Sequence, residues 1–200
     1  MTDRLPPTPE GLARAAELLR DGHLVAFPTD TVYGVGVAAS RPERLEALFD
    51  LKRRPAEKRV PILVAGLAQA VAAGWIADER AHLLGERFWP GPLTLILPGT
   101  GETQAFRAPD HPVALELIAA AGPILATSAN RSGEPDTLGA DEVLIAFASQ
   151  QDELAAVVDG GRVPGGVAST VLDLSVAPAR ILREGPISAA ALGEVVDLDA

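Results

Sequence analysis

The sequence predicts one α/β domain with a mixed parallel and antiparallel sheet flanked by helices. Short apolar runs bounded by Gly and Pro, typical of buried strands, alternate with amphipathic stretches typical of helices. Several of these runs are joined by too few residues for a βαβ crossover, so some neighbouring strands must be antiparallel. The chain has no internal repeat, and Gly160–Gly166 is too short to separate two cores. We therefore expect residues 1–200 to form a single domain.

The first elements have clear boundaries. Thr8-Pro9-Glu10 combines an N-cap, a proline at the first helical position and an early acid, and Gly22 ends this helix. A strand over residues 23–28 follows. Ser40-Arg-Pro-Glu43 reads as a capping box that opens a second helix, which Pro55 stops.

The later elements follow from apolar runs and helical periodicity. Trp89-Pro-Gly-Pro92 predicts a rigid turn, and Gly160–Gly166 predicts a flexible connector. Further strands are expected at residues 60–64, 93–97, 104–108, 123–127, 155–158, 169–174 and 179–183. Further helices are expected at 67–73, 77–88, 111–121, 140–149 and 188–196.

Composition restricts location and chemistry. No apolar run approaches the ~18 residues of a membrane span, and the N-terminus lacks the hydrophobic region of a signal peptide, so we expect a cytoplasmic protein without a membrane partner. There is no cysteine, which excludes disulfides and a thiolate nucleophile. The histidines, His23, His82 and His111, lie far apart. We expect no protein-built metal site, while a metal carried in by a nucleotide stays open.

Charge is unevenly distributed. The net charge is −10, with 14 basic and 15 acidic residues in 1–133 but 3 and 12 in 134–200. This balance disfavours neutralisation of a nucleic-acid backbone, so we expect weak or no direct nucleic-acid binding. The exception is five cations in the eight residues 52–59, which suit a small polyanion. This cluster is either a solvated helix end or part of a site. Lys52 and Arg54 favour the site, since 15 of the 17 basic residues are arginine and a lysine offers a more compact charge.

Polar residues directly follow two predicted strands. Thr29, Asp30, Thr31 and Tyr33 come after the first strand, where open α/β proteins usually place ligands. The alternative is a turn whose Asp and Thr cap their own backbone. Ser128-Ala-Asn130 follows another strand and has no G-x-S-x-G context for a nucleophile. It forms either a strand-to-loop turn or a set of hydrogen bonds to phosphate or carbonate-like oxygens.

A dinucleotide-binding motif matches in its residues but not in the predicted secondary structure around it. Gly34-Val-Gly36-Val-Ala-Ala39 matches G-x-G-x-x-A, yet that fingerprint needs a helix opening at the glycines. Here the glycines lie in an apolar, strand-like run, and the next helix start is Ser40. We therefore expect no Rossmann site.

Seven short blocks occur together in a fixed order. They are Pro28-Thr-Asp-Thr-Val-Tyr-Gly34, Lys52-x-Arg54-Pro55, Trp89-Pro-Gly-Pro-Leu-Thr94, Arg107-x-Pro109-x-His111-Pro112, Ser128-x-Asn130-x-Ser132-Gly133, Ser169-Thr-Val171 and Leu182-Arg183. From about residue 10 to 187, the chain resembles the YrdC-like family of threonylcarbamoyl-AMP synthases in its short, single-domain form.

The resemblance implies a fold and a reaction. The fold is a twisted mixed sheet around a deep cavity. The reaction joins ATP, L-threonine and bicarbonate into threonylcarbamoyl-AMP and releases pyrophosphate, with Mg²⁺ carried by the nucleotide. Downstream tRNA threonylcarbamoyl-transferase proteins would then modify adenosine in tRNA.

The resemblance also assigns roles to residues of this chain. It implies four catalytic residues, Lys52, Arg54, Ser128 and Asn130. It implies threonine binding by Thr31, Arg107 and Ser169, and ATP binding by Lys52, Arg54, Thr103, Ser128 and Arg183. The chain departs from the family pattern at three positions: Asp136 replaces a serine near the nucleotide, and Glu184 and Ala168 replace prolines. We expect Asp136 to face solvent or Mg²⁺ rather than a phosphate oxygen, because like charges repel.

Two other functions stay open. The same fold would serve a non-catalytic binder of RNA or nucleotide, although the net charge of −10 argues against it. A synthase-like domain could also act on another carbamoyl donor or acceptor.

Overall fold

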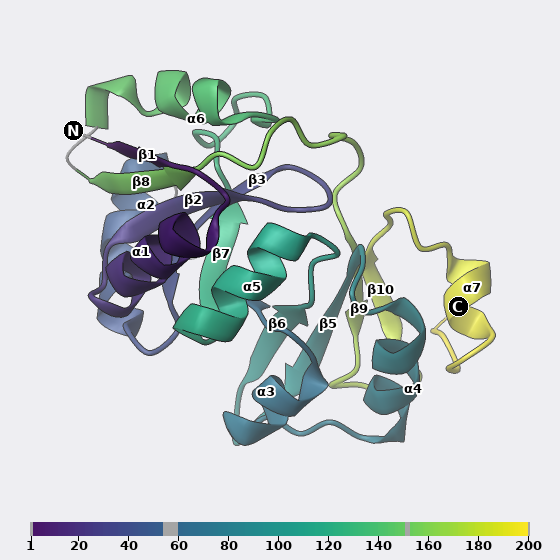
Figure 1. Cartoon of the computed structure of the whole chain (residues 1–200). Coiled ribbons are helices and arrows are strands. Elements are labelled where there is room, and N and C mark those ends of the chain that lie inside the picture. Colours follow the sequence, from purple (N-terminus) through teal and green to yellow (C-terminus); the bar gives the residue numbers. More distant parts are fainter. Residues whose placement is uncertain (1, 54–59, 151–152, 200) are drawn as a thin grey trace. The chain divides into compact units, whose positions relative to one another are not determined.

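The structure, a computed structural model, describes residues 2–53, 60–150 and 153–199. It contains two compact units: Met1–Val60 with His111–Gly166, and Pro61–Asp110 with Val167–Ala200. In the described part of each unit, strands of a mixed sheet combine with helices (Figure 1). The predicted class, a mixed parallel and antiparallel sheet flanked by helices, is confirmed. A single domain spanning residues 1–200 and a deep cavity stay predictions.

The first unit has the strand order β1-β8-β2-β3-β7. Strand β8 is parallel to β1 and β2, whereas β3 is antiparallel to β2 and β7. The short connection between β2 and β3 is therefore a hairpin-type turn, an example of the antiparallel neighbours that the close spacing of apolar runs predicted without naming the pair. The strands are β1 (Asp3–Leu5), β2 (Leu24–Pro28), β3 (Tyr33–Ala38), β7 (Ile124–Ser128) and β8 (Leu154–Val158).

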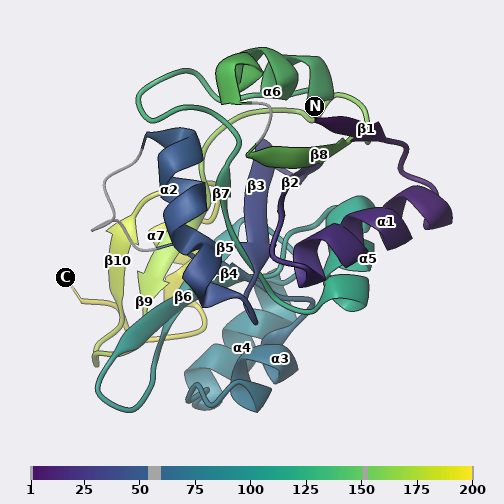
Figure 2. The ribbon, with the colours of Figure 1, turned by 90° about the vertical axis from the view of Figure 1, so that its left-hand side faces the viewer.

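Helices cover both faces of this sheet. Helices α1 and α5 lie on one side of β2 and β3, and α2 lies on the other (Figure 2). Thr8 caps α1 as predicted, because its Oγ1 accepts from the Gly11 amide at 3.3 Å. The helices are α1 (Pro9–Arg20), α2 (Leu45–Lys52), α5 (Pro112–Ala121) and α6 (Ala140–Ala146), with 3₁₀ turns at Pro42–Arg44 and Ala148–Gln150.

The second unit has the strand order β4-β6-β5-β9-β10. Strand β6 is parallel to β4 and antiparallel to β5; β9 is parallel to β5 and antiparallel to β10. The strands are β4 (Ile62–Leu63), β5 (Leu93–Pro98), β6 (Thr103–Arg107), β9 (Thr170–Asp173) and β10 (Arg180–Arg183), and the helices are α3 (Leu67–Ala72), α4 (Glu79–Phe88) and α7 (Ala189–Gly193).

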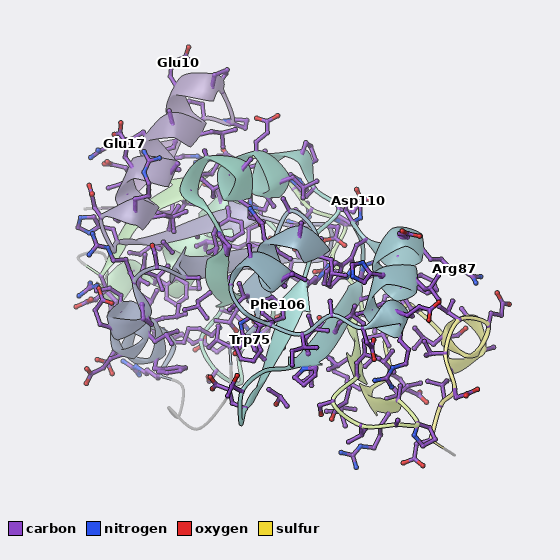
Figure 3. The ribbon with its side chains drawn as sticks, turned by 90° about the horizontal axis from the view of Figure 1, so that it is seen from below. Glu10, Glu17, Trp75, Arg87, Phe106 and Asp110 are labelled. Carbon is purple, nitrogen blue, oxygen red and sulfur yellow. The ribbon has the colours of Figure 1, made fainter. Side chains whose placement is uncertain are left out.

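The core of the second unit forms around β5. Leu93, Leu95 and Leu97 of this strand are fully buried, and they pack in a cluster with residues of α4 and α7. The rings of Trp75 and Phe106 meet edge to face in the same cluster, with centroids 5.6 Å apart (Figure 3). Burial of these leucines fixes the backbone of β5, which also carries Thr94 and Ile96.

Strand β3 contains both glycines of the dinucleotide motif. Gly34 and Gly36 pair with β2 and β7, and no helix opens at them, so the prediction that these glycines lie in a strand-like run is confirmed. A Cβ on Gly36 would lie 2.4 Å from the carbonyl oxygen of Leu125. The glycine at this position therefore allows β7 to approach β3 closely.

Some predicted boundaries are wrong. The Ser40 capping box does not form, because a 3₁₀ turn precedes α2 and neither Arg41 nor Arg44 at the N-cap positions makes a side-chain cap. Strand 60–64 contracts to β4, and helix 188–196 ends at Gly193. Among the described residues, no helix has both the length and the apolar character needed to cross a membrane.

Candidate active site

In the first unit, three strand ends bring polar segments to one edge of the sheet. Pro28 at the end of β2 pairs with Tyr33, and Gly34 pairs with Ser128 at the end of β7. The backbone continues these contacts beyond the strands: the Ala129 amide donates to the Tyr33 carbonyl at 2.7 Å. The two polar segments predicted from the sequence, after β2 and after β7, therefore lie side by side.

The segment after β2 is a turn organised by Thr29. Its hydroxyl donates to the Val32 carbonyl at 2.7 Å and accepts from the Thr31 amide at 3.3 Å. Thr29 and Thr31 are both buried, and their hydroxyl oxygens are 3.2 Å apart. The turn interpretation is confirmed for Thr29, and the role of Thr31 in threonine binding stays a prediction.

Lys52 is the last residue of α2, and it points inward. Only 2% of the residue is exposed. Its Nζ donates to the carbonyl oxygens of Ser128 and Asn130, the latter at 2.5 Å, and lies 3.3 Å from Asn130 Oδ1. Its own carbonyl accepts from the Ser132 amide at 3.0 Å. The side chain and main chain of Lys52 thus both hold the segment that follows β7.

The side chains of that segment complete the network. Ser128 Oγ donates to Asn130 Oδ1 at 2.6 Å, and Asn130 Nδ2 donates to the Glu134 carbonyl at 2.6 Å. The structure therefore brings together three of the four predicted catalytic residues, Lys52, Ser128 and Asn130. The fourth, Arg54, lies outside the described residues.

In the second unit, Ser169 lies at the centre of another polar cluster. Arg183 donates twice to it, from Nε to the carbonyl at 3.0 Å and from Nη2 to Oγ at 3.1 Å. The hydroxyl oxygens of Ser169 and Thr94 are 2.8 Å apart. Thr94 carried no predicted role, although it is the last residue of Trp89-Pro-Gly-Pro-Leu-Thr94, one of the seven blocks on which the resemblance depends.

Arg107 belongs to the same cluster. It ends β6, and its Nε donates to the Gly91 carbonyl at 3.1 Å. Partial burial, together with the charge of Arg107, lowers the pKa of Arg183 from its usual value. Two guanidinium groups close enough to interact form a favourable environment for an anion. The structure thus unites Arg107, Ser169 and Arg183.

Thr103 is not part of this cluster. It begins β6 while Arg107 ends it, so the two Cα atoms are roughly 13 Å apart along the strand. In the first unit, Asp136 is exposed, in agreement with the expectation that it faces solvent. Glu184 and Ala168, the other two departures from the family pattern, are also exposed.

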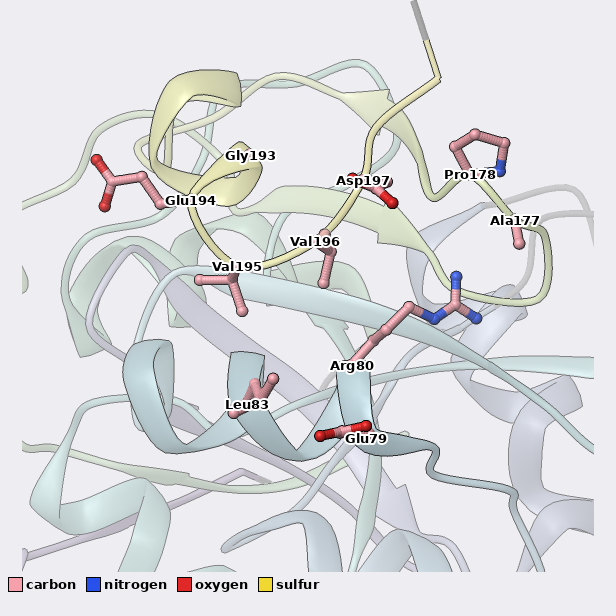
Figure 4. A pocket seen from close by; sticks show the side chains of 10 residues that line it. All are labelled: Glu79, Arg80, Leu83, Ala177, Pro178, Gly193, Glu194, Val195, Val196 and Asp197. Carbon is pink, nitrogen blue, oxygen red and sulfur yellow. The ribbon is translucent and has the colours of Figure 1, made fainter.

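A groove of about 560 Å³ lies elsewhere in the second unit, between α4 and the end of the chain (Figure 4). It contains none of the predicted site residues. Arg80 in this groove donates to the carbonyls of Leu174 and Val176, both at 2.8 Å, and so holds a loop. Within the described residues, no group of three or more His, Asp and Glu could hold a metal ion.

Tyr33 links the polar edge of the first sheet to the Gly160–Gly166 connector. Its hydroxyl donates to the Gly161 carbonyl at 2.7 Å, and its side chain is fully buried. Burial, and then the charge of Asp159, raise the pKa of Tyr33 to about 12.

This pKa can be measured directly, because Tyr33 is the only tyrosine of the chain. We expect the ultraviolet absorbance of tyrosinate to titrate near pH 12 in the native protein, and near the ordinary value of about 10 in denaturant. Since the folded pKa is the higher one, the free energy of unfolding should fall as pH rises through this window. Tyr33→Phe should remove that fall. A native midpoint near the ordinary value would contradict the burial of Tyr33.

Comparison with known proteins places this chain in a family. The Sua5/YciO/YrdC family model, described as "Telomere recombination", matches residues 17–185. The threonylcarbamoyl-AMP synthases of Bacillus subtilis and Pyrococcus abyssi are 40% and 39% identical to the chain, over 94% and 91% of its length. These matches cover 57% and 56% of the two relatives, so the chain spans little more than half of their length.

A solved structure agrees with the sequence matches. The crystal structure of P. abyssi Sua5 complexed with L-threonine has a TM-score of 0.89 and 34% identity, covering 100% of this chain and 62% of that one. Sequence identity and fold thus point to the same set of proteins. The chain belongs to the Sua5/YciO/YrdC family.

Proposed function

We propose that this protein is an L-threonylcarbamoyladenylate synthase, a nucleotidyltransferase that converts ATP, L-threonine and bicarbonate into threonylcarbamoyl-AMP and pyrophosphate. The observation that carries the proposal is the network of Lys52, Ser128 and Asn130 at one sheet edge. It lies in a chain whose relatives at 39–40% identity bear the name threonylcarbamoyl-AMP synthase.

The chemistry of this reaction matches the available residue types. The amine of L-threonine takes up carbon dioxide from bicarbonate as a carbamate. A carbamate oxygen then forms a bond to the α-phosphorus of ATP, and the bond from that phosphorus to the pyrophosphate oxygen breaks. Both reactants are anions, so neutralisation and alignment matter more than a strong base. Arginines, hydroxyls and an amide supply these, without a cysteine or histidine nucleophile.

Each predicted residue has a role in this proposal. Lys52, Arg54, Ser128 and Asn130 are assigned to catalysis, with Lys52 ordering the backbone of the Ser128–Asn130 segment. The L-threonine ligands are Thr31, Arg107 and Ser169. The ATP ligands are Lys52, Arg54, Thr103, Ser128 and Arg183. Mg²⁺ enters with the nucleotide as part of the substrate.

The proposal extends to the cellular role. The product would pass in the cytoplasm to proteins that transfer the threonylcarbamoyl group to adenosine in tRNA, as the first step of N6-threonylcarbamoyladenosine formation. The net charge of −10 supports weak or no direct binding of nucleic acid by this chain.

The test is to incubate the pure protein with MgATP, bicarbonate and single amino acids and to measure pyrophosphate. We expect release that requires both bicarbonate and L-threonine, with little release for L-serine or without an amino acid. Release that is independent of bicarbonate and L-threonine would contradict the proposal. Tight, sequence-selective RNA binding without pyrophosphate release would support the binding-protein alternative instead.

A further inference from the structure

Two buried hydroxyl groups form a pair in the second unit. Thr94 on β5 is 5% exposed, and Ser169, next to β9, is 4% exposed. Their oxygens are 2.8 Å apart, and either hydroxyl can donate to the other. For Thr94, this is its one side-chain hydrogen bond within the described residues.

The two hydroxyl groups have one more proton to donate than the described residues have acceptors for. Each hydroxyl carries one proton and two lone pairs. The shared bond consumes one of the two protons. Arg183 contributes a further N–H to Ser169 Oγ at 3.1 Å but can accept nothing. One hydroxyl proton is therefore left for an acceptor that the described residues do not supply, at a site where an unmade hydrogen bond is costly.

The surrounding charges indicate what that acceptor is. Arg183 donates to Ser169, and Arg107 is near enough to lower the pKa of Arg183. An oxyanion bound between cations would take the proton of Ser169, whose oxygen is already an acceptor for Arg183. The second lone pair of Ser169 is then filled by the proton of Thr94.

We infer that Thr94 is a positioning residue: it donates to Ser169 Oγ and so directs the Ser169 proton toward an oxyanion of the substrate. With both lone pairs of Ser169 occupied, Ser169 acts only as a donor. The site then favours a ligand group that accepts a hydrogen bond, such as an anionic oxygen, over a group that donates one, such as an amine or a hydroxyl. This inference rests on the proposed function, whose two oxyanions are the L-threonine carboxylate and the ATP phosphates.

The backbone makes Thr94 a rigid support. β5 is paired on both sides, with Thr94 opposite Val171 of β9. The amide of Thr170, the residue after Ser169, donates to the Pro92 carbonyl at 2.9 Å. A β-branched side chain in a strand also has few χ1 rotamers. Both hydroxyls are thus held in register by the sheet.

Thr94→Val keeps the side-chain shape and removes only the hydroxyl. We expect KM to rise about tenfold for the substrate that donates the oxyanion, with kcat close to that of the wild type. A rise for L-threonine alone identifies the carboxylate as the acceptor, and a rise for ATP alone identifies a phosphate. Thr94→Ser retains the hydroxyl and should restore KM.

Three controls separate positioning from general damage. Ser175→Ala removes another hydroxyl of this unit, one that bonds Asp173 at 2.6 Å, and should leave both KM values unchanged. The thermal midpoint of Thr94→Val should fall by no more than that of Thr94→Ser. Thr94→Val combined with Ser169→Ala should have the KM of Ser169→Ala alone, because Thr94 acts through Ser169.

Wild-type KM values for Thr94→Val, or effects that multiply in the double variant, would overturn the inference. Failure of the proposed function is a different result: the wild type would then release no threonine-dependent pyrophosphate. In that case calorimetric titration with L-threonine and with inorganic pyrophosphate still tests the donor role. Thr94→Val should weaken the binding of one of these anions about tenfold, and equal binding by the wild type and the variant would overturn the inference.

Discussion

Replacing Lys52 by methionine should lower turnover at least about a hundredfold and reduce the thermal midpoint. The Nζ of Lys52 donates to the backbone carbonyls of Ser128 and Asn130 and lies 3.3 Å from Asn130 Oδ1, and the residue is 2% exposed. Methionine fills similar space but removes the ammonium donor from the two carbonyls, while Asn130 Oδ1 still accepts from Ser128 Oγ. Each buried acceptor left unpaired costs about 1–3 kcal/mol, and a displacement of about 1 Å at reacting groups costs roughly a hundredfold in rate.

The cost of burying the ammonium does not reverse this expectation. A buried charge is expensive, but removing one partner of a buried polar cluster is usually worse than keeping it, by about 3–5 kcal/mol for an ion pair. The partners here are carbonyl and amide oxygens without formal charge, so we expect a loss toward the lower end, about 2–3 kcal/mol. The thermal midpoint should fall by several degrees.

Lys52→Arg keeps the charge and tests the geometry. A planar guanidinium cannot place three donors at the single point that Nζ occupies. We expect at least about a tenfold loss of turnover. Arg14→Met is the control in the same unit: Arg14 is half exposed and pairs with Glu17 across 3.3 Å, so its loss should change neither quantity much. Wild-type turnover and stability in Lys52→Met would show that the network is not required.

The fold class followed from the sequence because apolar runs report burial directly. The sequence predicted that some neighbouring strands are antiparallel without saying which, and β2 and β3 form one such pair. β1 escaped prediction because it has three residues, two of them exposed charged residues, and pairs with β8 from the far end of the chain. No local pattern encodes such a pairing.

The start of α2 was mispredicted for a local reason. Ser40-Arg-Pro-Glu43 has the letters of a capping box, but Pro42 begins a 3₁₀ turn, and α2 starts only at Leu45. Capping by a serine requires its side-chain oxygen to face the third backbone amide of an α-helix. In the tighter 3₁₀ turn, that amide does not occupy the α-helical position. The sequence alone cannot distinguish these two openings.

The candidate site was predicted in part. The sequence predicted polar residues after β2 and after β7, and the structure shows that these two segments lie side by side. The inward direction of Lys52 was not visible in the sequence, because a cation in the last turn of a helix usually complements the dipole in solvent. Thr94 and Gly185 were missed as well. Their importance comes from contacts across strands that adjacent sequence positions do not reveal.

Gly185→Ala should be the most damaging small substitution in the second unit. A Cβ on Gly185 would lie 2.3 Å from the Thr170 amide nitrogen, 2.5 Å from the Ala168 carbonyl oxygen and 2.7 Å from the Ser169 carbonyl carbon. All three atoms belong to the backbone, so no side chain can rotate to make room. Gly185 and the segment around Ser169 must move apart by roughly 1 Å to reach ordinary contact.

That movement separates the partners on which the proposed oxyanion site depends. Arg183, two residues before Gly185, donates to both the carbonyl and the hydroxyl of Ser169. We expect turnover to fall about a hundredfold, with a loss of about 1–3 kcal/mol in the free energy of unfolding from overpacking. Steady-state kinetics and thermal unfolding of the same preparation measure both effects.

Gly66→Ala is the matched control. Gly66 is in the same unit, has an extended φ of 173° and has no atom within 4 Å of an added Cβ. Alanine there should leave both measurements near the wild type. If Gly185→Ala lost stability but kept wild-type kcat and KM, the segment would have moved without consequence for the reaction. Arg183 and Ser169 would then not bind the substrates, and the threonine and nucleotide sites would have to be sought among other residues.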